Sequence, residues 1–529
     1  MKLKASFRSV ASLTALALFL GACSEEASGP EIKGTLINTV EGFAGVIAAD
    51  EPRAVQIGRE VLGRGGTAAD AATAMYFAMT VSLPSRVGLG AGGVCLIRDQ
   101  ERDESKMLSF PIIQSKEGGT VPTSLRAIAA MQARYGIIRW GELVSYGERL
   151  ARFGNPVSRS FAYDLALAEK RLRVDRRLLS RYARKDGRLP REGNSINQFE
   201  LASVLSGIRA QGAGYLYDGQ LTNRYARAAT AAGMPIQPAD LRSYIPAFVD
   251  PIKVEVDDES VIVSGQAGQS GVVAGTGYAL MVDHFDLEDA DQEEKAVAIA
   301  EALKRAWSAR GEALATGKNS LTEEGLEGLA AGFNAEKASN FALASNARAV
   351  AGNPFSAGFS VIDRFNGAVA CSFSLNGLFG AQRVAGETGV IMGKADAGNK
   401  VPVSDNLTAM LIVHEARGEV RFAGSASGGA VGASALAQVA ALSKGGAVPL
   451  KDAGSNPRIH HSGQPDVAFV EQKGKEELSV LTSAGFTARQ APEFGRVNAA
   501  LCVRSVDRNP NSCTAYSDER GYGLAQRAQ

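Results

Sequence analysis

The segment that most constrains the fold of this 529-residue chain begins at Ser356. Two apolar stretches follow it, Phe359–Asp363 and Ala368–Leu375, and Asn366-Gly367 lies between them. Asn-Gly supplies the positive φ angles that a two-residue hairpin turn requires, so the two stretches predict an antiparallel pair of strands. Ser356 therefore stands at the start of a predicted strand of the core.

The rest of the chain alternates between helical and strand patterns. A second hairpin is predicted from Met410–His414 and Val420–Ala423, and strands are predicted at Ile252–Val256 and Val261–Val263. Residues 315–355, rich in Gly, Ala, Asn and Lys, predict an exposed connection. Helices surrounding hairpin-rich sheets indicate an α+β layered core. The predicted helices cover residues 52–66, 67–81, 123–152, 160–173, 197–211, 294–314 and 430–442.

Composition and spacing exclude several classes of function. A net charge of +1 provides no basic surface for nucleic acid. Gly88–Gly93 matches the dinucleotide pattern G-x-G-x-x-G, but a predicted helix precedes it and a strand follows, the reverse of a Rossmann turn. No Cys or His group has zinc spacing, so we expect no metal and no cofactor. Histidine is scarce in the chain, which has only His284, His414, His460 and His461.

The N-terminus has the features of an export signal. Lys2, Lys4 and Arg8 precede the apolar stretch Leu13–Leu20, and Leu20-Gly21-Ala22-Cys23 resembles the lipobox of bacterial lipoproteins. We expect a signal peptide over residues 1–22, acyl chains on Cys23 and a polar tether over residues 23–35. Ser24 favours the periplasmic face of the outer membrane. The alternative is an ordinary cleaved signal peptide in which Cys23 has no role.

The four further cysteines fall into two groups with different predicted states. Cys502 and Cys513 bracket a short polar loop, and in an exported protein they predict a disulfide. Cys95 and Cys371 lie in apolar strand patterns, which predicts buried free thiols.

Ser356 also offers a mechanism that needs no histidine. If the peptide bond before Ser356 is cleaved, the freed α-amino group lies beside the hydroxyl. An α-amino group has a pKa near 7.7–8.0, so it can act as the general base at neutral pH. The alternative from this pattern alone is that Ser356 is an ordinary loop serine.

Several runs together resemble the γ-glutamyltranspeptidases, from about Val46 to about Gly523. Asn353–Asp363 resembles the self-cleavage junction of that family, with Ser356 in place of the nucleophilic Thr. Gly65–Ala72, Asn456–His461 and Ser517–Arg520 resemble further family motifs in matching order. The resemblance implies a four-layer αββα N-terminal-nucleophile fold, with residues 36–355 similar to the large subunit and 356–529 to the small subunit. It also implies a small amide substrate, such as glutathione or another γ-glutamyl compound.

The resemblance implies roles for individual residues. Ser356 takes the position of the nucleophile, and Ser374 that of the hydroxyl beside it. Gly428-Gly429 matches the pair whose N–H groups form the oxyanion hole. Asn376 and Ser404 match residues that contact the substrate.

The departures from the family concentrate on recognition of the γ-glutamyl group. Ala357-Gly358 replaces Thr-His after the nucleophile, Pro111 stands where the family has a carboxylate-binding Arg, and Asp405 replaces a carboxylate-binding Ser. Losing an Arg–carboxylate pair costs several kcal/mol. These departures leave two functions open: an amide hydrolase or acyltransferase with an unassigned donor, and a catalytically silent lipoprotein that binds or scaffolds in the envelope.

Overall fold

The computed structural model describes residues 41–173, 176–266, 269–344, 355–396 and 403–529. Cys23 and the predicted segments 1–22 and 23–35 lie outside these residues. In the described part, no helix combines the length and the apolar character needed to cross a bilayer.

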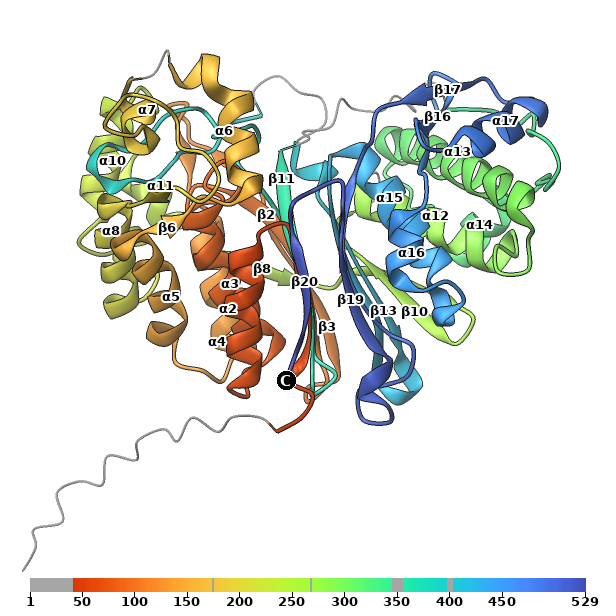
Figure 1. Cartoon of the computed structure of the whole chain (residues 1–529), viewed down its shortest axis with the longest axis horizontal. Helices are drawn as coiled ribbons and strands as arrows, with labels where there is room; N and C mark the ends of the chain where they lie inside the picture. Colours follow the sequence, from red (N-terminus) through yellow and green to blue (C-terminus); the bar gives the residue numbers. More distant parts are fainter. Residues whose placement is uncertain (1–40, 174–175, 267–268, 345–354, 397–402) are drawn as a thin grey trace, which may run out of the picture. The chain divides into compact units, whose positions relative to one another are not determined.

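Two antiparallel sheets pack face to face between two helical layers (Figure 1). The first sheet has the order β20 (Leu524–Ala528), β1 (Gly45–Ala49), β11 (Ser356–Asp363), β12 (Ala368–Ser374), β2 (Gly92–Asp99), β3 (Glu104–Phe110) and β8 (Ala247–Val249). The second has the order β19 (Cys513–Ser517), β18 (Arg496–Cys502), β14 (Glu419–Ser427), β13 (Thr408–His414), β10 (Glu259–Val263) and β9 (Ile252–Val256). This is the expected four-layer αββα sandwich.

Each interface between layers has its own apolar core. Phe359 and Phe373 of the first sheet pack against helices that include α3 (Ala68–Ser82) and α5 (Trp140–Phe153). Phe422 of the second sheet packs against α12 (Ser270–Ala279), α13 (Gln292–Thr316) and α15 (Ala430–Leu442). Alternate residues of both sheets fill the space between them, because successive side chains of a strand point to opposite faces. Val46, Leu96, Ile362, Leu411, Val413 and Ala423 belong to this central core.

The remaining elements extend the helical layers and the edges. The helices are α2 (Pro52–Gly63), α4 (Ser124–Tyr135), α6 (Arg159–Leu172), α7 (Arg176–Tyr182), α8 (Phe199–Gln211), α9 (Gly214–Tyr217), α10 (Thr222–Ala231), α11 (Pro238–Ser243), α14 (Glu323–Ala330), α16 (Leu450–Ser455) and α17 (Lys475–Ser483). The short strands are β4 (Ile113–Gln114), β5 (Thr120–Val121), β6 (Asn155–Pro156), β7 (Ser195–Ile196), β15 (Ile459–His461), β16 (Ala468–Glu471) and β17 (Ala488–Ala491).

One prediction from the sequence is wrong, and another is incomplete. Cys95 and Cys371 are not free thiols: they lie opposite each other on β2 and β12 and form a disulfide. The part of the predicted connection 315–355 that the structure describes contains α14, whose N-terminus is capped by the Thr322 hydroxyl. Cys502 and Cys513 lie opposite each other on β18 and β19 and form the second disulfide.

Candidate active site

Ser356 is the first residue of β11, a central strand of the first sheet. It lies opposite Ser374 of β12 and is 1% exposed. Two residues further along, the Gly358 N–H donates to Asp50 Oδ2 at 2.9 Å, while the Asp50 N–H donates to the Gly358 carbonyl at 3.2 Å. The start of the strand is therefore held on both sides, by Asp50 and by β12, which holds the backbone that carries Ser356.

The second sheet supplies a donor to that hydroxyl. The Gly428 N–H lies 3.4 Å from Ser356 Oγ. Gly428 has φ +117° and Gly429, the N-cap of α15, has φ +69°; both angles favour glycine. The N-terminus of α15 adds a positive electrostatic potential at this point. An oxyanion that forms on a carbonyl attacked by Ser356 would therefore be stabilised here.

Ser374 faces the peptide bond that precedes Ser356. Its hydroxyl donates to the Phe355 carbonyl oxygen at 3.4 Å and accepts from the Asn376 N–H at 2.9 Å. A donor at this carbonyl favours attack on the Phe355–Ser356 bond, since negative charge develops on that oxygen.

The predicted substrate contacts are only partly brought together. The Asn376 amide donates from Nδ2 to the Lys394 carbonyl at 3.0 Å, so the structure uses it to hold the chain after β12. Ser404 lies in the short helix Val403–Asn406, and its side chain falls outside the described part. Pro111 directly follows β3 and carries no charge with which to bind a carboxylate.

Asp405 has neighbours that the sequence did not indicate. Its Oδ1 accepts from Gln269 Nε2 at 2.7 Å, and burial raises the pKa of its carboxyl against the effect of that hydrogen bond and of Arg310. Arg310, on α13, is 3% exposed, and burial lowers its pKa against the attraction of Asp405. Within the described residues, its Nε and Nη2 have no hydrogen-bond partner. A buried cation therefore accompanies the aspartate in this region.

A second set of charged residues lies near Ser356. Arg86 forms a buried bidentate pair with Asp164, at 2.7 Å from Nε and 2.6 Å from Nη2, and its Nη1 lies 3.5 Å from the Ser356 carbonyl oxygen. Arg496 donates from Nε to the Ser427 hydroxyl at 3.0 Å and lies 3.8 Å from Asp50. Burial and the nearby Arg86 lower the pKa of Arg496 to about 10. Arg86 and Asp164 are 78 residues apart in the sequence, so no local pattern links them.

None of the histidines with described contacts lies at this site. His460 shares a hydrogen bond with the Ser434 hydroxyl at 2.8 Å, and burial lowers its pKa to about 3. His461 contacts Asp466 at 2.9 Å and His414 contacts Asp258 at 3.2 Å. In the described residues, no group of His, Cys, Asp and Glu side chains has the arrangement of a metal site.

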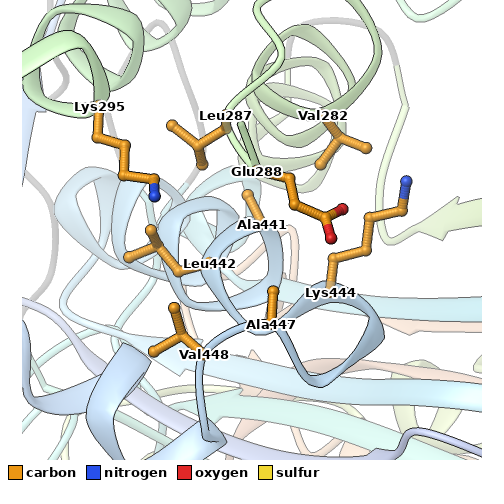
Figure 2. A pocket seen from close by; sticks show the side chains of 9 residues that line it. All are labelled: Val282, Leu287, Glu288, Lys295, Ala441, Leu442, Lys444, Ala447 and Val448. Atoms are coloured by element: carbon orange, nitrogen blue, oxygen red, sulfur yellow. The ribbon is translucent and has the colours of Figure 1, made fainter. Parts of the chain in front are cut away.

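Two cavities of different size lie at opposite ends of α15. A cavity of about 510 Å³ opens beside Ser427 and Gly428, where α15 begins. A smaller one, of about 110 Å³, lies where α15 ends and is lined by Leu442 and Lys444 together with Leu287, Glu288 and Lys295 (Figure 2). Of these two cavities, only the larger is lined by Phe355 and Gly428, the neighbours of Ser356, so it is the candidate substrate site.

Comparison with known proteins decides the family. The family model for γ-glutamyltranspeptidase matches residues 54–117 and 112–528. The chain belongs to the γ-glutamyltranspeptidase family. It is 24% identical to the glutathione hydrolase proenzyme of Bacillus subtilis over 553 residues, which is 92% of this chain and 91% of that protein. It is 27% identical to glutathione hydrolase 3 of Arabidopsis thaliana over 298 residues, which is 52% of this chain and 46% of that protein.

A solved structure shows the same fold. The cephalosporin acylase of Bacillus halodurans matches with a TM-score of 0.77 at 19% identity, over 92% of this chain and 96% of that one. At this identity the match shows that the two chains share a fold. This chain is thus a divergent member of the γ-glutamyltranspeptidase family, a family of hydrolases and transferases that act on small amides and peptides.

Proposed function

We propose that this chain is an amide hydrolase or acyltransferase whose nucleophile is Ser356, released as an N-terminal residue by self-cleavage. The main support is the position of the Ser356 hydroxyl, which begins a central strand and lies 3.4 Å from the Gly428 N–H at the start of α15. A nucleophile and an oxyanion donor are thereby held by two different sheets.

The proposed reaction starts within the chain itself. Ser356 Oγ attacks the Phe355 carbonyl carbon, whose oxygen accepts a hydrogen bond from Ser374. The bond to the Ser356 nitrogen breaks, that nitrogen takes a proton, and water hydrolyses the resulting ester. The freed α-amino group then serves as the general base for Ser356 Oγ on external amides. The acyl group passes to water or to an amine.

Cleavage is tested directly on purified protein. Incubation at neutral pH should yield two fragments on a reducing denaturing gel and a new N-terminus at Ser356. Ser356→Ala should remain whole, and Ser374→Ala should cleave about 10²-fold more slowly because it lacks a donor to the scissile carbonyl. Ser203→Ala, at an exposed position on α8, is the matched control and should cleave normally. A wild-type chain that stays whole would instead favour the silent binding protein.

The location of the protein is a separate proposal that rests on the lipobox-like segment. Cys23, which lies outside the described residues, is proposed to carry the lipid that holds the protein on the periplasmic face of the outer membrane. Wild-type protein should partition into detergent, and Cys23→Ser should remain in the aqueous phase. Equal partitioning of the two proteins would contradict the anchor.

A further inference from the structure

The cavity beside the nucleophile has an apolar mouth that the chemistry described so far does not use. Tyr163 and Leu167 lie one turn apart on α6, and Tyr522 lies in the connection between β19 and β20. These three side chains are 47%, 52% and 40% exposed, and the two tyrosine rings are 5.9 Å apart. Large exposed apolar side chains gathered at the mouth of a cavity are typical of a binding site.

The chain itself places an aromatic group in this cavity. Phe355 is one of the residues that line it, together with Gly428 and Val431. During self-cleavage, Phe355 becomes the acyl group of the ester on Ser356 Oγ. Every later substrate forms its ester on the same oxygen, so the cavity that holds the Phe355 side chain is the place for the substrate's acyl group.

Four charged residues line the cavity: Arg496 lies 3.8 Å from Asp50, Glu493 is exposed, and Arg86 and Arg520 have closer carboxylate partners. Arg86 is held by Asp164. Arg520 pairs with Glu471 at 2.5 Å and with Asp518 at 3.2 Å. A cavity whose arginines already have carboxylate partners does not require a charged ligand. A negatively charged ligand would lose its hydration there and gain no free, oppositely charged side chain in exchange.

We infer that this cavity binds an uncharged aromatic acyl group, so that the substrates are amides of arylacetic or similar aromatic acids. This deepens the proposed function and rests on Ser356 being the acyl-accepting residue. Asn376 and Asp405 are not among the residues that line the cavity. The proposed acyl site is therefore separate from these two residues, which match the γ-glutamyl-binding positions of the family.

Kinetics with three anilides tests the substrate class. Phenylacetyl-4-nitroanilide should have a kcat/KM at least tenfold higher than acetyl-4-nitroanilide and γ-glutamyl-4-nitroanilide, because a ring is buried on binding. Tyr163→Ala should reduce the ratio of phenylacetyl to acetyl turnover at least fivefold. Phe153→Ala, 77% exposed at the end of α5, is the matched control and should leave this ratio unchanged.

The outcomes separate the two proposals. If turnover depends on Ser356 but acetyl or γ-glutamyl anilide is preferred, the aromatic assignment is overturned and the hydrolase remains. If no anilide shows Ser356-dependent turnover, the result counts against the proposed function, and binding then decides what the cavity accepts.

Binding is measured in a chain that cannot cleave itself. In the Ser356→Ala background, Phe355→Ala should increase the affinity for phenylacetamide at least fivefold by calorimetry, because it removes the ring that lines the cavity. Phe355→Leu should give a smaller gain, and Phe365→Ala, in the turn that follows β11, should give none. Equal affinities of the Phe355→Ala and Phe365→Ala proteins would overturn the inference.

Discussion

At the scale of single residues, the reactivity of Ser356 requires a neighbouring base. A serine hydroxyl is a weak nucleophile until a neighbour accepts its proton. The described contacts of His414, His460 and His461 are with Asp258, Ser434 and Asp466, so these imidazoles are engaged elsewhere. In the proposed mechanism, the α-amino group that cleavage would release is the base.

The first prediction at the scale of single residues concerns Asp405. An aspartate near the position of the donor's α-carboxylate repels it, and Pro111 supplies no compensating cation. We expect γ-glutamyl-4-nitroanilide to turn over at least about 10²-fold more slowly than with a typical family member, which corresponds to about 3 kcal/mol of lost transition-state binding.

Substitution at Asp405 tests this explanation. Asp405→Ser combined with Pro111→Arg should recover part of the rate, and Asp405→Asn alone should recover less, through the neighbouring cation of Arg310. Asp289→Asn, at an exposed position, controls for the change in net charge. Efficient turnover of γ-glutamyl-4-nitroanilide by wild-type protein would show that the pocket has been placed on the wrong residues.

At the scale of secondary structure, the active site depends on contact between the two sheets. Ser356 and Ser374 belong to β11 and β12 of the first sheet, whereas Gly428 follows β14 of the second. The N-terminus of α15 lies beside Ser356 because β14 ends near the start of β11. A loss of packing between the sheets would therefore separate Ser356 from Gly428, the proposed nucleophile and oxyanion donor, without changing either residue.

The paired strands also predict the state of the cysteines. Labelling of unfolded, unreduced protein should modify none of Cys95, Cys371, Cys502 and Cys513, because both pairs are disulfide-bonded. Reduction before labelling should expose all four. Mass spectrometry of labelled peptides measures this, and modification of Cys371 without reduction would contradict the structure.

Sequence patterns predicted those elements whose formation depends on residues close together in the chain. The β11–β12 hairpin forms where Asn366-Gly367 predicts it, but the strands are joined through residues 364–367 and only Asn366 of the two has a positive φ, +58°, so the turn is longer than the predicted two-residue one. The apolar run at 430–442 coincides with α15. The pairing of Cys95 with Cys371 was missed because it depends on β2 and β12 being neighbours across 276 residues. Arg86 and Asp164 were missed for the same reason. The helix α14 had a local signal in Thr322, a capping residue followed by two glutamates, which the composition of its surroundings obscured.

At the scale of the whole molecule, burial between the layers makes stability depend on pH. Glu51 lies at the N-terminus of α2 and is 1% exposed; burial raises the pKa of its carboxyl to about 7, against a hydrogen bond from the Ser158 hydroxyl at 2.7 Å. The unfolded chain releases this proton near pH 4.5, whereas the folded chain holds it to about pH 7. Between these values the folded state binds more protons, so the free energy of unfolding falls as the pH rises.

Glu51→Gln removes this dependence, because glutamine stays neutral and still accepts from Ser158. We expect the variant to match wild type near pH 4.5 and to exceed it by up to about 3 kcal/mol at pH 8. Urea unfolding at a series of pH values measures the difference. Glu476→Gln, at an exposed position on α17, is the control, and a difference that does not grow with pH would contradict the buried carboxyl.

The disulfide between Cys95 and Cys371 spans the Phe355–Ser356 bond. One cysteine precedes the bond and the other follows it, so self-cleavage would produce a covalently joined heterodimer rather than two separable subunits. A non-reducing gel of fully processed protein should show one band near full length, and reductant should resolve it into two. Cys371→Ala should give two bands without reductant, whereas Cys513→Ala, in the pair that lies entirely after the bond, should not. In an oxidising compartment, the two halves of the mature enzyme would thus not dissociate from each other, even at high dilution.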